Sequence, residues 1–400
     1  MKKILFSLLI FVLTFFFIGC NNNKTDEITI WHDKEDALIE VLESFLNEKL
    51  PDINVNFIRK ESLTDTLKLV GNSAKSAPDM YIFAHDKVGL FAEIGILQEI
   101  TDYIAIDSFD NYVELTIEAA TYKEKLYQLP LYYETLLFMY NKDRMAESEV
   151  PITTEDLYNY MIENTDARRY GFVEQYSNAY YSAGWIHGFN GGILDIQGNP
   201  TLNTPEVNQA IAYHQKFIEY MPKGQAEYAT INTLFLEKKA NSIIAGPWLV
   251  PQARDNGINL GFARMPLIEE TGLPISPYAG VQGIHVLKVA GQDEERFDKI
   301  GRILECLLDV EIGVNLAEVS GVAPANLLAY ENELVSNNDL VMAMKAAAED
   351  AIPMPNLPQM DVMWNTTSKM LTQIHLNGQA IGTMLEQAQR ESEELIALMQ

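Results

Sequence analysis

The sequence predicts an α/β protein with mostly parallel strands, organised as two or three domains. Its 400 residues suffice for that number of domains at about 100–200 residues each. The 48% apolar and 21% charged residues are those of an ordinary folded chain, which excludes wholesale disorder. In the first half of the chain, short apolar runs alternate with amphipathic helical patterns, and this alternation is typical of α/β layers.

The alternation begins with a strand over residues 28–31. The helix after it repeats apolar residues at helical spacing from Leu38 to Leu46, and Pro51 ends the unit. The next elements are expected as a strand at 53–58, a helix at 62–74 capped by Ser62, a strand at 79–83 and a helix at 87–94.

Two consecutive strand-like stretches, at 126–132 and 135–140, interrupt the alternation and indicate a crossover between domains. The elements after them are expected as helices at 154–164, 205–220 and 231–239 and strands at 242–245, 261–264 and 280–288. The remainder is largely helical in pattern and ends in a polar amphipathic segment at 379–399.

The chain is strongly acidic, because 56 Asp and Glu against 29 Lys and Arg give a net charge of −27. It offers no basic footprint for phosphate backbones, which excludes nucleic acid as a partner. The same charge repels an anionic bilayer, so membrane attachment must come from another device. The two cysteines, Cys20 and Cys306, are too few for a disulfide scaffold. Cys306 is expected to be a buried free thiol.

The N-terminus has the pattern of a secretory signal peptide over residues 1–19. Lys2 and Lys3 precede an apolar run that is short for a membrane-spanning helix. The stretch that ends at Cys20 resembles a bacterial lipobox, in which the cysteine is acylated and becomes the first mature residue. Residues 20–26 are then a lipidated, polar linker, and the exported protein is anchored to the outer face of the cytoplasmic membrane. An uncleaved anchor or an ordinary signal peptide with a chance cysteine is the alternative.

Catalytic and metal-binding motifs are absent from the sequence. It contains no His-Glu-x-x-His and no Cys–His spacing for zinc. It contains no P-loop, no Gly-x-Ser-x-Gly and no Gly-x-Gly-x-x-Gly. We therefore expect no cofactor and no metal, and in an exported, aromatic-rich chain this favours a binding module over an enzyme.

Aromatic and charged side chains gather instead where the predicted strands end. Asp86 and Lys87 follow the strand at 79–83, Glu134 closes another strand, and Trp248 follows a third. Ligands of open α/β sheets lie in the crevice beyond the carboxyl ends of the strands. Flat rings and planar hydrogen-bonding groups suit a sugar, because its CH faces stack on rings while its hydroxyls take hydrogen bonds.

Four short stretches carry a family resemblance: Ala-His-Asp-Lys at 84–87, Tyr-Asn-Lys-Asp at 140–143, Gly-Pro-Trp at 246–248 and Met-Pro-Asn-Leu-Pro-Gln-Met at 354–360. With them the chain resembles, from Ile28 to its C-terminus, the maltose/maltodextrin-binding proteins of ABC importers, a branch of the extracellular solute-binding proteins. The resemblance implies a periplasmic-binding-protein-like fold, with two α/β lobes, a hinge and a ligand cleft between them. It also implies a monomeric receptor that captures malto-oligosaccharides by hinge closure and delivers them to a membrane permease.

The lobe boundaries are expected at the crossovers. The N-terminal lobe then comprises residues 27–132 plus 283–330, and the C-terminal lobe comprises 133–282 plus 331–400. Several strands, rather than one linker, would join the two lobes and form the hinge.

The resemblance assigns polar contacts with the sugar. Asp86 and Lys87 match an acid and a basic residue that hydrogen-bond sugar hydroxyls from the N-terminal lobe. Glu134 matches a second carboxylate near the crossover. Asp33 and Lys34 fall near an Asp–Lys pair that holds the sugar, although the loop around them is shorter here.

The resemblance also assigns the apolar wall. Trp248 and Trp364 match the large stacking aromatics of the C-terminal lobe, and Met354 lines the same wall. Tyr228 keeps the family spacing of twenty residues before Trp248. Phe83 stands where the best-known members carry Trp, so stacking there is weaker or the sugar lies differently.

One tyrosine platform has two candidates. Tyr181 matches it, and Tyr180 is the rival because insertions nearby blur the alignment. The acid that normally lies two residues before the tyrosine is Ala179 here. That polar contact is then missing, or Glu174 supplies it.

Other interpretations stand beside these assignments. Asp86 is also a good helix N-cap, and His85 is assigned to packing. A second function class is an exported carbohydrate-active enzyme that uses Asp86 and Glu134 as acid and base, since paired carboxylates suffice for glycoside hydrolysis. A receptor for a different oligosaccharide is the third, kept open by the two departures above.

Overall fold

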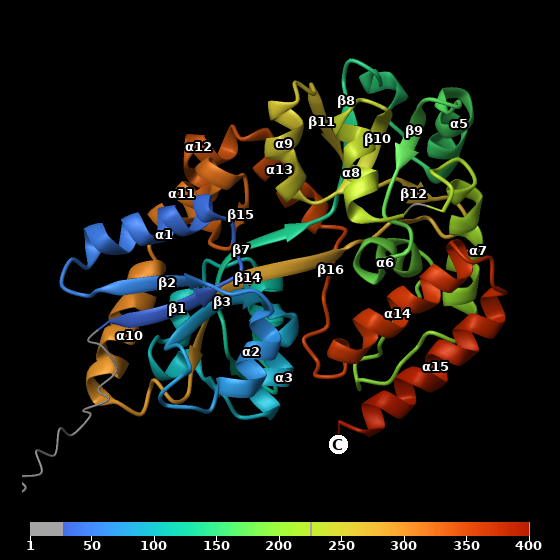
Figure 1. Cartoon of the computed structure of the whole chain (residues 1–400). Coiled ribbons are helices and arrows are strands. Elements are labelled where there is room, and N and C mark those ends of the chain that lie inside the picture. The colour runs from blue at the N-terminus through green and yellow to red at the C-terminus, as the bar shows by residue number, and fades with distance from the viewer. Residues whose placement is uncertain (1–26, 225, 400) are drawn as a thin grey trace, which may run out of the picture.

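The computed structural model describes residues 27–224 and 226–399, so the predicted signal peptide, Cys20 and the linker at 20–26 lie outside the described residues. Figure 1 shows two halves, each built around its own sheet and covered by helices. The strands β7 (Leu129–Thr135) and β14 (Tyr278–Leu287) run from one half toward the other. We call the half with the eight-stranded sheet the first lobe and the half with the four-stranded sheet the second lobe.

The sheet of the first lobe has the order β15-β7-β14-β3-β1-β2, with β4 and β16 also paired to β14. Its remaining strands are β1 (Ile28–His32), β2 (Val55–Arg59), β3 (Met80–Ala84), β4 (Leu97–Gln98), β15 (Ala323–Pro324) and β16 (Ile352–Pro353). β1 is parallel to β2 and β3, as the alternation predicts, but β14 is antiparallel to β3 and β7. The sheet is therefore mixed rather than mostly parallel, because a late strand inserts antiparallel between two early ones.

The sheet of the second lobe has the order β11-β8-β10-β9. Its strands are β8 (Leu137–Asn141), β9 (Tyr170–Val173), β10 (Ala240–Ala245) and β11 (Leu260–Ala263). Two small pairs lie outside both sheets: β5 (Thr121–Tyr122) with β6 (Lys125–Leu126), and β12 (Leu267–Ile268) with β13 (Leu273–Pro274).

Helices cover both sheets (Figure 1). Those of the first lobe are α1 (Asp36–Lys49), α2 (Leu63–Val70), α3 (Val88–Glu93), α4 (Glu114–Ala120), α10 (Glu294–Leu307) and α11 (Val310–Ser320). Those of the second lobe are α5 (Thr154–Asn164), α6 (Ala179–His187), α7 (Pro205–Ile218), α8 (Tyr228–Leu236), α9 (Val250–Asp255), α14 (Met360–His375) and α15 (Ile381–Ala397). α12 (Glu333–Ser336) packs on α11, and α13 (Asp339–Ala348) contacts strands of both sheets.

Several helices differ from the sequence prediction, among them α2, α6 and α8, which begins and ends three residues earlier than expected. α2 ends at Val70, where Gly71 follows, rather than near residue 74. The prediction that Ser62 caps this helix is wrong, because Ser62 has a left-handed backbone (φ 50°) and its side chain makes no cap hydrogen bond. α6 is absent from the prediction. All of its residues except Tyr180 are buried, so the helix carries no amphipathic pattern.

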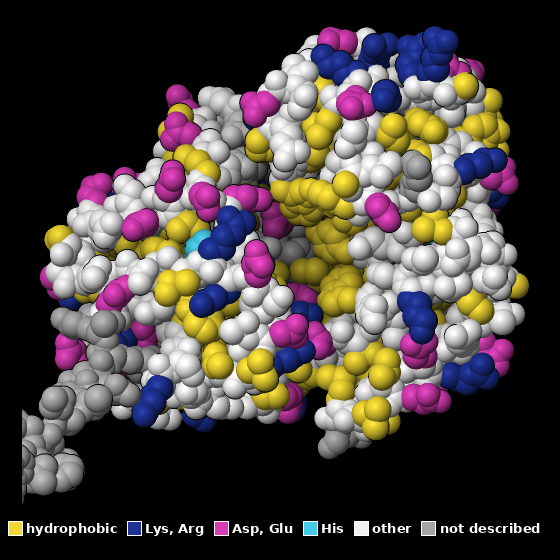
Figure 2. Space-filling model, in the orientation of Figure 1, with side chains coloured by type: hydrophobic (Ala, Val, Ile, Leu, Met, Phe, Trp, Pro, Cys, Tyr) yellow, Lys and Arg dark blue, Asp and Glu magenta, His cyan; other side chains and the backbone are white. Residues whose placement is uncertain are grey.

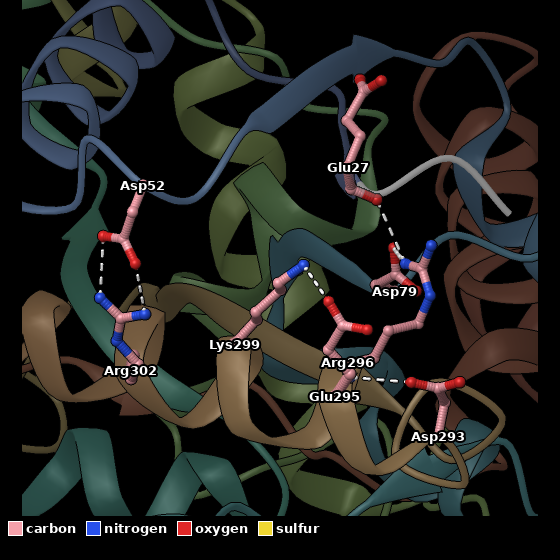
Figure 3. A network of polar contacts seen from close by, with 8 residues as sticks. All are labelled: Glu27, Asp52, Asp79, Asp293, Glu295, Arg296, Lys299 and Arg302. Atoms are coloured by element: carbon pink, nitrogen blue, oxygen red, sulfur yellow. Dashed lines mark hydrogen bonds and ion pairs between the residues drawn. The ribbon is translucent and has the colours of Figure 1, made fainter.

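A buried ion pair fixes the start of α10 to the first sheet (Figure 3). Arg296 Nη1 lies 2.8 Å from Asp79 Oδ2, and the same oxygen accepts from the Thr29 amide at 2.9 Å. One carboxylate therefore joins β1, the start of β3 and α10. Further along the helix, Arg302 makes a two-pronged contact with Asp52 at 2.7 and 2.9 Å.

The described chain crosses between the two lobes at three places. Leu136 is the single residue between β7 and β8. The second crossing leads from β11 through β12 and β13 to β14, and the third is the segment 354–359 between β16 and α14, which we call the strap. The predicted boundaries at 132/133 and 282/283 fall within β7 and β14.

The strap is held to the first lobe by its backbone and by one amide. The Gly89 N–H donates to the Asn356 carbonyl at 2.9 Å, and Asn356 Nδ2 donates to the carbonyls of Ala119 and Thr121 at 2.9 and 2.7 Å. A Cβ at Gly89 would lie 2.2 Å from the Asn356 carbonyl oxygen, so this close approach requires glycine.

Candidate functional site

Asp86 lies in a short 3₁₀-helix, η1 (His85–Lys87), directly after β3. Its Oδ2 accepts a hydrogen bond of 3.1 Å from Trp364 Nε1 and lies 3.2 Å from Lys87 Nζ. No side-chain cap hydrogen bond forms at η1 or α3, so Asp86 faces the other lobe rather than capping a helix. Burial lowers the pKa of Lys87, but the carboxylates of Asp86 and Asp361 outweigh it and hold that pKa above its usual value. The ammonium therefore stays charged.

Glu134 is the second acid, and it lies near the end of β7. Its Oε1 accepts a hydrogen bond of 2.8 Å from Gln282 Nε2 on β14. Burial raises the pKa of Glu134, and the nearby Lys34 ammonium opposes that rise. The Glu134 carboxylate is therefore a poorly hydrated hydrogen-bond acceptor, suited to a hydroxyl donor of a ligand.

Lys34 lies in the loop after β1, and its positive charge acts on Glu134. Its ammonium lies 2.7 Å from Asp33 Oδ1 and 5.4 Å from the centre of the Phe83 ring. Asp33, Lys34 and Glu134 line one cavity of about 130 Å³, and Trp248 from the second lobe lines it from the other side. The structure thus brings the predicted Asp–Lys pair to the same cleft as Glu134.

Three rings of the second lobe form a cluster. Tyr180 lies 6.5 Å from Trp248 and 6.3 Å from Trp364 between ring centres, and 5.6 Å from Tyr181 at a steep angle. Trp364 also meets the Tyr278 ring edge-on at 5.7 Å. Tyr180 thus lies near both tryptophans and is half-buried, whereas Tyr181 is buried in the core cluster. Which of the two tyrosines forms the platform stays a prediction.

Trp248 lies in the 3₁₀-helix η5 (Pro247–Leu249), which follows the buried strand β10. Its ring covers Gly246 so closely that a Cβ there would lie 2.2 Å from the indole. The Gly-Pro-Trp sequence therefore has a physical reason: only glycine lets the ring fold back over the backbone. Trp248 remains half-buried and lines the same cavity as Glu134.

The remaining predicted residues lie at the edge of this cluster. Tyr228 begins α8 and is 48% exposed. Met354 begins the strap and is buried, and its carbonyl accepts from His85 Nε2 at 2.8 Å. His85 Nδ1 accepts from the Val281 amide at 3.0 Å, so this ring is a neutral structural link between η1, β14 and the strap. That geometry agrees with its assignment to packing.

Glu174 does not reach the cleft. Its carboxylate is fully buried and accepts from Trp185 Nε1 at 3.0 and 3.2 Å, and it lies 2.5 Å from His214 Nε2. The structure therefore gives no support to Glu174 as the replacement for the acid missing before the tyrosine. For Tyr180, the position two residues earlier is Asn178, whose amide oxygen caps α6 by accepting from Tyr180 N at 2.9 Å.

Sequence reasoning missed Asp361 and Gln282, which contact the predicted residues Lys87 and Glu134, and it missed Lys68, which contacts Asp361. Asp361 precedes Trp364 by three positions, so a helix beginning near 360 would have placed both on one face. Nothing in the local sequence of Lys68 or Gln282 marks them, because their partners are distant in the chain.

Figure 2 shows a hollow between the two halves, with hydrophobic side chains gathered along its wall. Rings on one side and carboxylates on the other can hold a polyhydroxylated ligand by stacking and hydrogen bonding. Within 27–224 and 226–399, no helix is long and apolar enough to cross a bilayer. In the same residues, no group of three or more His, Cys, Asp or Glu is arranged to hold a metal ion.

Residues 42–343 match the family described as bacterial extracellular solute-binding protein. The chain belongs to this family. Among solved structures, the chain is similar to the maltose/maltodextrin-binding domain MalE from Bdellovibrio bacteriovorus bound to maltotriose, with a TM-score of 0.82. It is 26% identical, and the match covers 93% of this chain and 100% of that one. The periplasmic-binding-protein-like fold with two lobes is thereby confirmed.

Three curated relatives of this extracellular solute-binding protein cover most of its length. The maltotriose-binding protein of Pyrococcus abyssi is 29% identical over 364 residues, which are 89% of this chain and 78% of the relative. The galactooligosaccharide-binding protein of Bacillus subtilis is 27% identical over 376 residues, with 88% and 85% covered. The maltooligosaccharide ABC transporter solute-binding lipoprotein of Streptococcus pneumoniae is 24% identical over 367 residues, with 88% and 84% covered.

Proposed function

We propose that the chain is the sugar receptor of an ABC importer and that it binds α-linked malto-oligosaccharides between its lobes. The observation that carries the proposal is the ring cluster of Tyr180, Trp248 and Trp364, which lies beside two carboxylates. Trp364 donates a hydrogen bond to Asp86, and Trp248 lines the same cavity as Glu134. Rings take the CH faces of a pyranose, while carboxylates accept from its hydroxyls.

The names of the relatives support a maltodextrin, and they also supply a second candidate. Proteins named for maltotriose and maltooligosaccharides match most of this chain. The galactooligosaccharide-binding protein matches it almost equally well, at 27% identity. Both ligand classes are neutral oligosaccharides that need rings and hydroxyl acceptors, so the cleft chemistry suits either.

Calorimetry with maltose, maltotriose and a β-linked galactotriose tests the proposal. We expect the malto-oligosaccharides to bind and Trp364→Ala to abolish or strongly weaken that binding. Binding of the galactotriose with none of the malto-oligosaccharides would favour the second candidate. An absence of heat with all three sugars would count against both.

Binding without chemistry is part of the proposal. Asp86 Oδ2 accepts from Trp364 and lies beside Lys87, and Glu134 Oε1 accepts from Gln282, contacts that suit fixed hydrogen-bond acceptors. The match to a solute-binding family and the names of the relatives also support binding without hydrolysis. Incubation with maltotriose should return it intact. Release of maltose or glucose would revive the enzyme alternative.

We further propose that Cys20 carries the lipid anchor, that the mature protein is a monomer, and that its closed form engages the permease. The lipoprotein name of the pneumococcal relative supports the anchor. Stable anchoring takes more than one acyl chain, which diacylation would supply. Cys20→Ala should release protein to the medium or leave an unprocessed precursor, and normal processing with membrane retention would contradict the anchor. Sedimentation of the mature chain checks the monomer.

We also propose that the two lobes bend about β7, β14 and the strap. The first lobe then comprises 27–132 plus 283–330, and the second comprises 133–282 plus 331–400. Several crossings allow bending without separation, so a ligand shifts an open–closed equilibrium. Small-angle scattering should show a smaller radius of gyration with maltotriose than without it. An unchanged radius would argue against closure around that ligand.

A further inference from the structure

A charged group outside the predicted site joins the two lobes at the first turn of α14. Asp361 Oδ2 lies 2.7 Å from the ammonium of Lys68, and Asp361 Oδ1 lies 3.1 Å from that of Lys87. Lys68 belongs to α2 and Lys87 to η1, both in the first lobe, whereas α14 packs on α6 and α15 of the second. We call Asp361, Lys68 and Lys87 the clasp.

The clasp is more sheltered than the acid beside it. The side chains of Lys87, Asp361 and Lys68 are 11%, 27% and 33% exposed, against 79% for Asp65, which lies 4.0 Å from Lys68 Nζ within α2. Water and salt screen an exposed pair far more than a half-buried one. Burial raises the pKa of Asp361, but Lys68 and Lys87 hold it below its usual value, so the carboxylate stays charged.

The clasp touches the residues that form the cleft. Lys87 also contacts Asp86, and Trp364, three positions after Asp361, donates to the same Asp86 oxygen. The strap directly before α14 is held to the first lobe through Asn356. A movement of the first turn of α14 would therefore displace Trp364 from Asp86 and Asp361 from Lys87 together.

We propose that Asp361 is a positioning residue of the receptor: it holds the first turn of α14 against Lys68 and Lys87 and so favours the closed arrangement of the lobes before any sugar enters. This inference rests on the proposed hinged receptor, but not on which sugar the receptor binds. The apparent affinity of a receptor scales with the fraction of molecules already in the binding-competent form. Loss of the clasp therefore weakens every ligand of the cleft by one factor and leaves their order unchanged.

The test compares Asp361→Asn with Asp65→Asn in the mature chain. Both changes remove an acid near Lys68, but only the first removes a contact between the lobes. Scattering without sugar should give a larger radius of gyration for Asp361→Asn alone. Calorimetry should show that variant weakened about 5- to 30-fold for each sugar that the wild type binds, equivalent to ~1–2 kcal/mol at 1.4 kcal/mol per decade. Added salt should lower the sugar affinity of the wild type and of Asp65→Asn more than that of Asp361→Asn.

A double-mutant cycle separates positioning from structural damage. Lys68→Met removes the same contact from the first lobe, so it should cost much less in the Asp361→Asn background than in the wild type. If Asp361→Asn fails to fold, Lys68→Met takes its place in the scattering and calorimetry experiments. Asp361→Glu, which keeps the charge, should recover part of the closure.

Additive effects of the two changes, or an Asp361→Asn protein with wild-type scattering and affinities, would overturn the proposal. If the wild type binds none of the sugars tested, the proposed ligand class fails. The radius of gyration of the sugar-free variants then still decides on the clasp.

Discussion

The indole Nε1 of Trp364 donates a hydrogen bond of 3.1 Å to Oδ2 of Asp86 in the opposite lobe. Lys87 lies 3.2 Å from the same oxygen, so a ring, a carboxylate and an ammonium meet at one point. Among the described residues, no hydrogen bond to Oδ1 of Asp86 is found. We expect a sugar hydroxyl to reach that oxygen.

Trp364→Ala should weaken sugar binding by ~2–4 kcal/mol, because it removes a large stacking face as well as the donor to Asp86. Trp364→Phe keeps a ring and loses only the donor, so its loss should be smaller. Calorimetry measures both, with melting temperature as the folding control. Equal losses for Phe and Ala would mean that the hydrogen bond, and not the stacking face, matters.

Glu134→Gln should have opposite effects on stability and on binding. Burial raises the pKa of Glu134, so its contribution to stability is present at low pH and is lost as pH rises through that raised pKa. At neutral pH the neutral Gln should therefore raise the melting temperature of the sugar-free protein. Losing the charged acceptor should weaken sugar binding about 10- to 150-fold, by calorimetry. A variant that is both less stable and unchanged in affinity would contradict this role.

Asp79→Ala should destabilise the fold by ~3–5 kcal/mol, since it takes away the buried carboxylate that faces Arg296 and the Thr29 amide. Asp52→Ala is the matched control, because its pair with Arg302 is exposed and such pairs contribute little to stability. Denaturant unfolding of both variants gives the comparison. Similar losses for the two would show that burial does not set the difference.

Acid should destabilise the protein from about pH 6.5 downward, the ordinary range of histidine. Burial lowers the pKa of five histidines, to about 4 for His187 and about 3 for His285 and His375, and also for His32 and His85. Their folded pKa values lie below the unfolded ones, so the unfolded chain takes up these protons first and stability falls as pH falls. Urea unfolding at steps between about pH 7.5 and about pH 4.5 measures this loss of stability, because that interval roughly spans the titration of histidines in the unfolded chain. A flat profile in that window would mean that these rings are hydrated.

Phe83→Trp should maintain or tighten binding of malto-oligosaccharides. The Phe83 ring faces the Lys34 ammonium at 5.4 Å, and a larger ring offers a larger stacking face on the same wall. Calorimetry with maltotriose measures the change. Weaker binding, with an unchanged melting temperature, would place the sugar away from this ring.

Local patterns were enough to predict the strands that precede the site, and longer-range pairing was not predictable from them. β1 and β3 are apolar runs between breakers, and the acid that follows β3 lies in the cleft as the crevice rule for open sheets predicts. The position of β14 between β3 and β7 depends on contacts far apart in sequence, and no local pattern encodes it. The expectation of mostly parallel strands failed for that reason.

Local patterns do not distinguish Tyr180 from Tyr181, because the distinction depends on the orientation of α6. Neighbouring helical residues point about 100° apart, and a helix buried nearly all round shows no polar side to decide which one faces a cleft. The link between Asp361 and Lys68 spans 293 positions, so only the folded structure brings those two residues together.

The single residue between β7 and β8, Leu136, also has a thermodynamic consequence for capture. So short a connection keeps the Trp248 wall at a high effective concentration relative to Glu134, because the two surfaces can swing but cannot diffuse apart. In the proposed receptor, a sugar that touches one wall then meets the second in an intramolecular step. The translational entropy of bringing two surfaces together was lost once, during folding, and is not lost again with each ligand.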